Sequence, residues 1–478
     1  MTSSTTISNT EPLHICSPAT RRELGVVPSA SASLVSETIS KAVAVQPAWA
    51  ERRTGERADI LEKSAALIDQ QASQWSRLLS EESGKILAQA QFELKLAAAM
   101  TRGNAERLRA MGGDLLPTGA LEATADDIAW VRRVPLGVVA AVLPFNFPVE
   151  LFVEKAAAAL AMGNAVIVKP PEQDPLTVIA VSEAFQNAGV PPDVLAVLPG
   201  GRQTGAALCA DPRLAAVSLT GSTRAGLEVA SIPVLRKLHL ELGGNDAAII
   251  CQDADLDLVS PELVFGRTLM NGQACAANKR IIVHRSISDE LVGRLSANLA
   301  QMRVGDPLDP ASTIGPLISV EAATRVGNQV ARAIDQGGSL AFGSATSRGA
   351  FFDPCVLADV PRTAEVAKDD EIFGPVFTCI PFDTEEEAIS IANQSSFGLS
   401  GCVFSRDWPR ALRISERLVC GGVVVNGTGN YRPFIVPFGG VKQSGLGREG
   451  LGFTMEEMSQ PRYTVLRRIR GGRGIQRQ

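Results

Sequence analysis

The stretch LGVVAAVLPFNFPVELFVEKAAAALAMGNAVIVKP, residues 136–170, contains two short apolar runs with a longer segment between them. LGVVAAVLP and NAVIVKP have the length and apolar content of buried strands. The intervening VELFVEKAAAALAMG is rich in Ala, Leu and Glu, which favour a helix. The order strand, helix, strand predicts two parallel strands joined by a crossover helix, the unit from which nucleotide-binding sheets are built.

The same alternation of short strands and helices continues along the chain. LTVIAVSEAFQNAG, VLAVLPG, GAALCA and LAAVSLTGS extend the first series, and AAIICQD, KRIIVH, VFTCIPF and GVVVNG form a second series after Gly243. Residues 34–110 show helical spacing of apolar residues and predict several helices before the first series. The predicted fold class is therefore α/β, with two doubly wound parallel-sheet domains.

Two strand-like segments lie outside these series. Residues 117–135 begin with turn residues and end in alternating apolar positions, and RYTVLRRIR near the C-terminus alternates in the same way. We expect the two segments to pair in one small projecting sheet.

The composition argues against several classes of protein. The length of 478 residues predicts two or three domains, and the net charge of −5 gives no basic field for nucleic acid. Eight cysteines without CxxC spacing resemble the reduced thiols of a cytoplasmic protein. His14, His239 and His284 are far apart and near no cysteine cluster, so neither a metal site nor a histidine triad is expected.

Neither the N-terminal segment nor the most apolar region of the sequence suggests insertion into a membrane. The N-terminal MTSSTTISNTEPLH lacks a basic segment followed by an apolar one, so no secretory signal is expected. The most apolar region, Val134 to Val168, is interrupted by Pro, Asn, Glu and Lys before it reaches spanning length. A cytoplasmic protein is the expectation.

Two glycine-rich turns compete as the site for a nucleotide's phosphates. Gly445, Gly447 and Gly450 form a literal G-x-G-x-x-G, but no apolar strand precedes them and no acidic residue completes the unit, so we reject them. In LAAVSLTGSTRAG a buried strand ends before Gly221 and Ser222, where the N-terminus of a helix could bind a pyrophosphate. An ordinary turn capped by Ser222 fits the same pattern equally well.

NAVIVKPPEQDP offers a second clue to a nucleotide. The strand ends in Lys169 and is followed by Glu172, at the carboxyl edge where nucleotides lie in such sheets. The lysine could hold ribose or phosphate oxygens, and the carboxylate could accept hydrogen bonds from a ribose diol. A solvated loop is the alternative, because exposure is the commoner fate of Lys and Glu.

Cys275 and Glu241 are the strongest candidates for chemistry. Both lie in Gly-rich runs, LMNGQACAANKR and LHLELGGND, and a thiol nucleophile with a carboxylate base suggests covalent catalysis. Considered alone, a cysteine is more often a buried apolar filler, and this glutamate could cap the glycine turn that follows it.

Together these segments resemble the NAD(P)-dependent aldehyde dehydrogenase superfamily over nearly the whole chain, from about residue 10 to residue 470. Seven motifs occur in the family's order, a combination far more specific than any one of them. They are PFNFP (144–148), KPPE (169–172), TGST (220–223), ELGG (241–244), GQAC (272–275), EIFGPV (371–376) and PFGGVKQSG (437–445).

The resemblance implies a role for each catalytic candidate. Cys275 matches the nucleophile that attacks the aldehyde, and Asn146 the amide that holds the oxyanion together with the backbone N–H of Cys275. Glu241 matches the base that activates water to hydrolyse the thioester. Branches that transfer the acyl group to coenzyme A lack this glutamate, so its presence favours a free carboxylic acid as product.

The resemblance also implies the cofactor contacts. They are Lys169 and Glu172 at the adenosine ribose, Gly221, Ser222 and Leu242 near the pyrophosphate turn and the strand beyond it, and Glu371 and Phe373 at the nicotinamide. A glutamate at position 172 resembles NAD-preferring members, because it would repel a 2′-phosphate. NADP stays possible, since some members move this side chain aside.

The substrate class is only partly indicated. Ala274, just before the nucleophile, stands where relatives that act on phosphorylated aldehydes have an arginine, and Phe145 stands where many members have tryptophan. We expect a small or aromatic uncharged aldehyde, with a semialdehyde of the succinate type as the alternative. Arg102, Arg107 and Arg109 lie on a helix that often borders the substrate tunnel, although exposed arginines are usually only solvated.

Lys155 and Glu449 fall where the family often places accessory charged groups. Predicted ranges are 8–116 and 136–243 for the nucleotide-binding domain, 244–443 for the catalytic domain, and 117–135 with 456–472 for an oligomerisation arm. The arm implies a homodimer or homotetramer.

Two other classes of function stay open from the residues alone. A cofactor-independent thiol esterase would use Cys275 and Glu241 without a dinucleotide. A noncatalytic structural homologue would usually have lost Cys275, Glu241 or Asn146, and all three are present.

Overall fold

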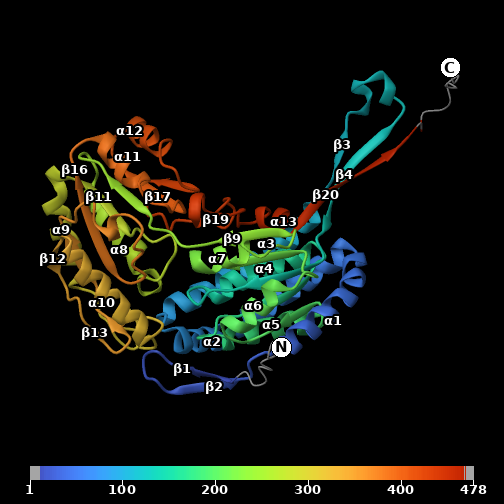
Figure 1. Cartoon of the computed structure of the whole chain (residues 1–478), viewed down its shortest axis with the longest axis horizontal. Coiled ribbons are helices and arrows are strands. Elements are labelled where there is room, and N and C mark those ends of the chain that lie inside the picture. The colour runs from blue at the N-terminus through green and yellow to red at the C-terminus, as the bar shows by residue number, and fades with distance from the viewer. Residues whose placement is uncertain (1–10, 468, 470–478) are drawn as a thin grey trace, which may run out of the picture.

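The computed structural model describes residues 11–467 and residue 469. Two open sheets lie side by side, each with helices on both faces, and a narrow arm projects from one end of the molecule (Figure 1). Residues 8–10 of the predicted nucleotide-binding range, and residues 468 and 470–472 of the predicted arm, lie outside the described residues. Among the described helices, none combines the length and the apolar character needed to span a bilayer.

The N-terminal part of the chain is mostly helical, which confirms the prediction for residues 34–110. A hairpin of β1 and β2 comes before three long helices, and α2 packs closely along α3. The bounds are β1 Leu13–Cys16, β2 Glu23–Val27, α1 Ala32–Glu51, α2 Thr54–Ser83 and α3 Leu87–Ala110. 

The stretch that opens the first series forms β5, α4 and β6, as predicted. Strands β5 and β6 are parallel neighbours, with Val138 opposite Ala165. The sheet has the order β19-β9-β8-β5-β6-β7, and β19 at its edge is its antiparallel member. The bounds are β5 Val138–Val142, α4 Pro148–Ala161, β6 Ala165–Lys169, α5 Leu176–Ala188, β7 Leu195–Val197, α6 Arg202–Ala210, β8 Ala216–Thr220, α7 Thr223–Ala230, β9 Lys237–Glu241 and β19 Gly445–Leu446.

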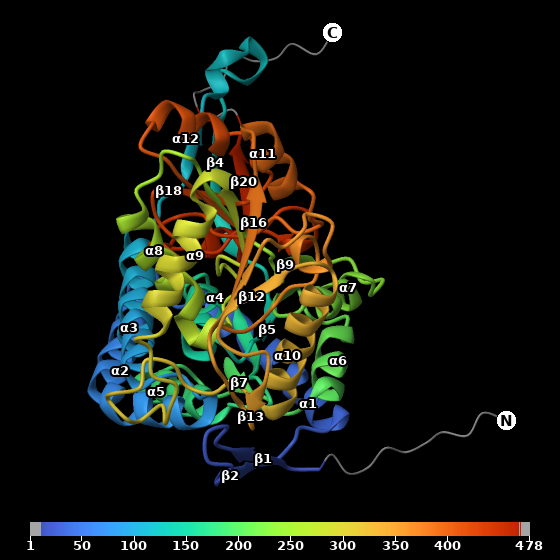
Figure 2. The same ribbon diagram turned by 90° about the vertical axis from the view of Figure 1, so that its left-hand side faces the viewer.

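The second series forms a separate sheet with the order β12-β15-β16-β11-β10-β17-β18, in which β12 at the edge is antiparallel. Apolar residues of α8 and α9 pack on one face and those of α10, α11 and α12 on the other (Figure 2). The strands are β10 Ala247–Ile250, β11 Arg280–His284, β12 Ser339–Phe342, β15 Cys355–Ala358, β16 Val376–Phe382, β17 Ser400–Phe404 and β18 Gly422–Val425. The helices are α8 Leu256–Thr268, α9 Arg285–Leu299, α10 Val320–Asp335, α11 Glu385–Asn393 and α12 Trp408–Ser415.

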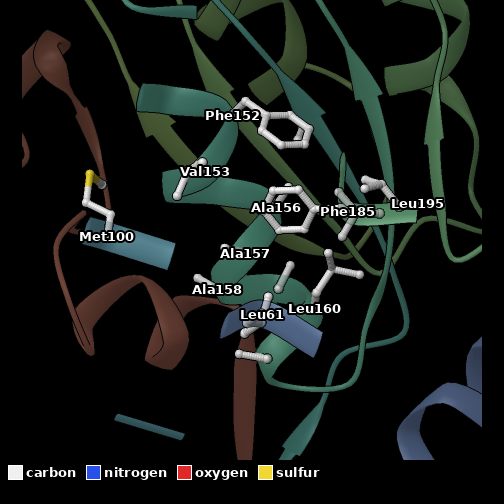
Figure 3. Packing of buried hydrophobic residues seen from close by; sticks show 14 of the residues in the cluster. Leu61, Met100, Phe152, Val153, Ala156, Ala157, Ala158, Leu160, Phe185 and Leu195 are labelled. Atoms are coloured by element: carbon white, nitrogen blue, oxygen red, sulfur yellow. The ribbon is translucent and has the colours of Figure 1, made fainter. Parts of the chain in front are cut away.

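Helix α4 lies in the core of the first sheet and is buried along almost its whole length. Its alanines let neighbouring elements approach closely, while Phe152 meets Phe185 of α5 edge to face with ring centroids 5.4 Å apart (Figure 3). Burial along almost its whole length explains why most positions of this helix are apolar, with Glu150, Glu154 and Lys155 as the charged exceptions.

The two separated strand-like segments pair, as predicted. β4 (Ile128–Pro135) lies between β3 (Asp114–Leu116) and β20 (Ser459–Leu466), and all neighbours are antiparallel. This three-stranded sheet forms the projecting arm (Figure 1). The ranges of the domains and of the arm as functional units stay predictions.

The rejected G-x-G-x-x-G has a packing role in the structure. Gly445 lies in β19 directly opposite Glu241, and a Cβ there would lie 2.0 Å from the Leu240 carbonyl oxygen. A Cβ at Gly450 would lie 2.3 Å from the Val436 carbonyl oxygen. Gly445 thus lets the C-terminal segment lie against β9 beside the candidate base, and Gly450 lets it approach the backbone of Val436.

Candidate active site

One cavity of about 1320 Å³ brings together the catalytic and cofactor-binding residues proposed from the sequence. Its walls include the carboxyl ends of β5, β6, β8 and β9, the segment around Cys275 and the loop that precedes β19. The predicted residues that line it are Asn146, Lys169, Glu172, Gly221, Ser222, Glu241, Leu242, Cys275, Glu371 and Phe373. They come from segments up to 227 positions apart, Asn146 and Phe373 being the outermost.

The segment before Cys275 has an unusual backbone. Met270 and Asn271 both have positive φ, 49° and 56°, which is uncommon for residues other than glycine. The Asn271 amide compensates by donating to the carbonyls of Gly84 and Pro316, at 3.0 and 2.8 Å. This bend in the backbone at Met270 and Asn271 places Cys275 in the cavity wall.

The surroundings of Cys275 favour the protonated form of its thiol. Burial raises its pKa well above the ordinary value, and the negative charge of Glu241 adds to the effect, while Lys279 and Arg432 oppose it. Attack on a carbonyl therefore requires a nearby group that accepts the thiol proton.

Asn146 lies in the β5–α4 loop with its side chain held in one orientation. Its Nδ2 donates to the Gln273 carbonyl at 2.9 Å, and its Oδ1 accepts from the Phe147 N–H at 3.2 Å. An amide nitrogen has two N–H groups, and the bond to Gln273 uses only one. Within the described part of the chain, the backbone N–H of Cys275 has no protein acceptor, so two donors are free on this side of the cavity.

Glu241 ends β9 and is 3% exposed, and its Oε1 has no hydrogen-bond partner among the described residues. Burial raises its pKa to about 8, and the charge of Glu449 acts in the same direction. Lys155 and Arg432 lower the pKa in part, as does a hydrogen bond with Cys275. The carboxyl is therefore poised to exchange protons near neutral pH.

Lys155 and Glu449, the predicted accessory charges, form a buried ion pair at 2.7 Å behind Glu241 rather than in the cavity wall. Burial disfavours the Glu449 carboxylate, yet the positive charges of Lys155 and Arg432 lower its pKa to about 2. The negative charge of Glu449 adds to the effect of burial, which is the larger cause of the raised pKa of Glu241.

The cofactor candidates of the first sheet occupy its carboxyl edge. The Ser222 hydroxyl caps α7 by accepting from the Ala225 N–H at 3.3 Å, so the capping interpretation is correct and leaves the Ser222 O–H free to donate to a ligand. Glu172 is exposed and lies beside Gly201, where a Cβ would come within 2.8 Å of its carboxylate. Burial lowers the pKa of Lys169.

The remaining cofactor candidates approach from the second half of the chain. Lys279 lies 3.1 Å from the Glu371 carboxylate, and the Gly244 N–H donates to that carboxylate at 3.4 Å. Phe373 meets Phe145 edge to face with centroids 6.0 Å apart. Both segments thus border the cavity next to the PFNFP loop. A cavity of this volume, with donors at a helix N-terminus and the carboxylates of Glu172 and Glu371 in its walls, fits a dinucleotide.

Three predicted arginines lie elsewhere. Arg102 pairs with Asp69, and Arg109 pairs with Asp59 and Glu62 at the surface between α2 and α3. Neither these residues nor Arg107 line the cavity, so the solvated alternative is correct.

Sequence reasoning missed the charged pair Glu150 and Arg432, which lines the cavity near Cys275. Glu150 breaks an otherwise apolar stretch, and this anomaly was the available signal. The aromatic side chains at the mouth, Phe92, Phe265 and Tyr431, were missed too, and no local pattern marks them. Within residues 11–467, no group of three or more His, Cys, Asp or Glu side chains could hold a metal ion.

Comparison with known proteins assigns this arrangement to a family. The model of the "Aldehyde dehydrogenase family" matches residues 5–464. A glutarate-semialdehyde dehydrogenase of Pseudomonas putida is 34% identical over 461 residues, which cover 96% of this chain and 95% of that protein. The succinate-semialdehyde dehydrogenase [NADP(+)] of Escherichia coli is 35% identical over 464 residues, with coverages of 96% and 95%.

Solved structures agree with the sequence comparison. The NADP-dependent glyceraldehyde-3-phosphate dehydrogenase of Bacillus halodurans, complexed with NADP, superimposes with a TM-score of 0.93 at 34% identity, covering 96% of each chain. Aldehyde dehydrogenase 21 of Physcomitrella patens, in complex with the reaction product succinate, gives a TM-score of 0.92 at 30% identity, with coverages of 97% and 96%. The chain therefore belongs to the aldehyde dehydrogenase family, whose members oxidise aldehydes with NAD or NADP.

Proposed function

We propose that Cys275 is the nucleophile, Asn146 the oxyanion donor and Glu241 the general base of an aldehyde oxidation that releases the free carboxylic acid. The observation that carries this proposal is that all three side chains line one cavity together with the seven residues expected to contact the cofactor.

The first half of the reaction uses Glu241 as the proton acceptor for Cys275. As the thiol proton passes to the carboxylate, Sγ bonds to the carbonyl carbon and the π electrons move to the oxygen. The free N–H of Asn146 and the backbone N–H of Cys275 stabilise that oxyanion, and one such donor contributes about 3 kcal/mol. NAD(P)⁺, when bound, supplies the acceptor for the hydride that leaves the same carbon.

The second half uses Glu241 again, after its first proton has passed to solvent. The carboxylate takes a proton from water as the water oxygen bonds to the thioester carbonyl. The C–S bond then breaks, the carboxylic acid is released, and the proton on Glu241 passes to the leaving sulfur to restore the Cys275 thiol. Water is the acyl acceptor because a carboxylate base lies beside the thiol.

For the substrate we propose a small or aromatic uncharged aldehyde. Ala274 offers no charge beside the nucleophile, and Phe92, Phe147 and Phe434 contribute apolar wall to the cavity. A semialdehyde is the second candidate, favoured by the relatives named for glutarate and succinate semialdehydes.

For the cofactor we propose NAD as the preferred form, because Glu172 is exposed in the cavity wall, where it could accept bonds from a ribose diol. We also propose a homodimer or homotetramer assembled through the arm. The cytoplasm is the proposed location, and the eight free cysteines support it.

Two variants test the proposed chemistry. Cys275→Ala should abolish aldehyde-dependent NAD(P)H formation while NAD binding, measured by calorimetry, persists. Glu241→Gln should slow thioester hydrolysis at least about a hundredfold, so that an acyl group loaded onto Cys275 from an activated ester persists in intact-protein mass spectrometry. Glu416→Gln, at the exposed end of α12, is the control and should match the wild type. Turnover by Cys275→Ala, or a wild-type rate in Glu241→Gln, would contradict the assignments.

A further inference from the structure

The guanidinium of Arg432, in the cavity wall, is held by ion pairs along one edge and by an aromatic ring against one face. Its Nη2 lies 3.5 Å from Glu150, 3.9 Å from Glu449 and 4.0 Å from Glu154. Its face lies over the ring of Phe438, with Cζ 4.2 Å from the centroid. Ion pairs along one edge and an aromatic ring below leave little freedom for this long side chain.

The other edge of the guanidinium is free. In the described part of the chain, Arg432 makes no hydrogen bond to protein, and only its Nη2 is both buried and unpartnered. Because the side chain is 16% exposed and lines the cavity, its remaining N–H groups face the cavity. Glu150 beside it is also 16% exposed and lines the same wall.

Arg432 and Glu150 thus present a donor and an acceptor next to each other. A guanidinium only donates hydrogen bonds, whereas a carboxyl group accepts them in either protonation state. A hydroxyl group both accepts and donates, so it can satisfy both side chains at once. Resting on the function proposed above, we propose that this pair recognises a hydroxyl group carried by the aldehyde substrate.

The position of the pair indicates where that hydroxyl group lies. Cys275 packs against the apolar cluster that contains Phe438, and Arg432 stacks on the same ring. Cys275 and Arg432 therefore border the same small apolar cluster. A substrate that reaches both is short, with its hydroxyl group one or two carbons from the carbonyl.

Glu150 can serve as the acceptor in either protonation state. Burial raises its pKa to about 7, and the positive charge of Arg432 opposes this shift, so Glu150 exchanges its proton near neutral pH. Its carbonyl oxygen accepts a hydrogen bond from a hydroxyl group whether or not the carboxyl is ionised. Because a guanidinium also attracts a carboxylate, the experiment includes an anionic aldehyde for comparison.

The experiment compares kcat/KM for propanal, 2-hydroxypropanal and 4-oxobutanoate in the wild type and in Arg432→Met. The wild type should prefer 2-hydroxypropanal to propanal, and the variant should lose about tenfold to a hundredfold of that preference, as expected for hydrogen bonds to charged groups. Taking the ratio of variant to wild type cancels differences in aldehyde hydration.

A second variant and a control keep the test decisive. If Arg432→Met does not fold, Glu150→Met should show the same loss of preference, since it removes the acceptor from an open position in the wall. Arg417→Met removes an exposed arginine paired with Glu386 and should change neither ratio.

Two results would overturn the inference. One is equal use of propanal and 2-hydroxypropanal by the wild type, which would leave the proposed function intact because propanal is still oxidised. The other is a preference for 4-oxobutanoate that Arg432→Met abolishes, which would identify a carboxylate as the recognised group. Failure to oxidise any aldehyde would instead count against the proposed function.

Discussion

Two buried glutamates close to the nucleophile show how local partners set their chemistry. Glu241 and Glu449 are 3% and 1% exposed. Burial raises the pKa of Glu241 to about 8, whereas Lys155 and Arg432 lower that of Glu449 to about 2. A direct ion pair outweighs desolvation in one case, and its absence lets desolvation dominate in the other. Glu241 can therefore exchange protons during catalysis, and Glu449 stays charged.

This difference predicts the pH dependence of acyl-enzyme hydrolysis. The raised pKa means that Glu241 is protonated below about pH 8 and cannot accept a proton from water. The hydrolysis rate should rise about tenfold per pH unit up to pH 7 and level off above pH 8, as measured by single-turnover decay of the acyl-enzyme. Glu449→Gln removes the neighbouring negative charge and should move the profile to lower pH. A wild-type profile that is flat from pH 6 to 9 would exclude Glu241 as the base.

A second prediction at this scale concerns the cofactor. Glu172→Ser removes a carboxylate that would repel a 2′-phosphate, so the ratio of kcat/KM for NADP to that for NAD should rise at least about tenfold. Glu183→Ser, on α5 outside the cavity, is the control. An unchanged ratio in Glu172→Ser would remove this residue from the ribose site.

At the scale of elements, carboxylates from distant helices cap the N-termini of two helices that pack on the first sheet. Helices α4 and α5 have no side-chain cap of their own. Glu93 of α3 accepts from the N–H groups of Val149 and Glu150 at 2.9 and 3.1 Å. Glu82 of α2 accepts from those of Leu176 and Thr177, both at 2.8 Å. These carboxylates satisfy the free N–H groups and the positive dipole ends, and so fix the loops that carry Asn146 and Glu172.

The loop before α5 also contains a buried acidic residue. Asp174 is fully buried, and neither carboxyl oxygen has a hydrogen-bond partner among the described residues. Burial raises its pKa well above the ordinary value, and Glu82 adds to the effect. The folded protein therefore retains this proton at pH values where the unfolded chain has lost it, and stability falls as pH rises above about 4.

Asp174→Asn should remove this loss of stability. The variant should be more stable than the wild type by about 1 to 3 kcal/mol at pH 8, with the difference shrinking toward pH 4, as measured by urea unfolding. The exposed Asp193→Asn serves as the control. A variant that is less stable than the wild type at pH 8 would show that the ionised carboxylate is needed.

At the scale of the whole molecule, the arm presents apolar side chains that the monomer leaves uncovered. Leu115 and Tyr463 are 75% and 73% exposed, and Leu116, Val465 and Leu466 are exposed beside them. A narrow sheet with such a surface and unpaired edge strands is suited to docking on another chain. Strands β4 and β20 pair although they lie more than 300 positions apart in the sequence. Docking of another chain on the arm would therefore stabilise this long-range pairing as well.

We expect the double change Leu115→Asp and Leu116→Asp to reduce the native mass, measured by light scattering, toward that of one 50.4 kDa chain. The far-UV circular dichroism should stay unchanged, because both residues lie on the projecting arm. Leu235→Asp, at a fully exposed position outside the arm, should leave the mass as it is. A wild-type protein that is monomeric at micromolar concentration would rule out assembly through the arm.

The sequence by itself determined the order of strands and helices and the identity of the reactive groups. Apolar runs such as those of residues 136–170 report local structure, and motifs such as GQAC report chemistry, and both can be recognised without distant contacts. Predictions for Cys275, Glu241 and Asn146 rested on such motifs, and the fold brought these residues to one cavity.

Only the tertiary structure decided how charges far apart in sequence meet. The pairing of Lys155 with Glu449, the placement of Arg432 beside Glu150, and the capping of α4 by Glu93 join residues 56 to 294 positions apart. No local periodicity encodes such contacts, because they form only when strands and helices pack. Those contacts set the pKa of the base and the polarity of the substrate wall, since in a buried site each charge is governed by its nearest partners.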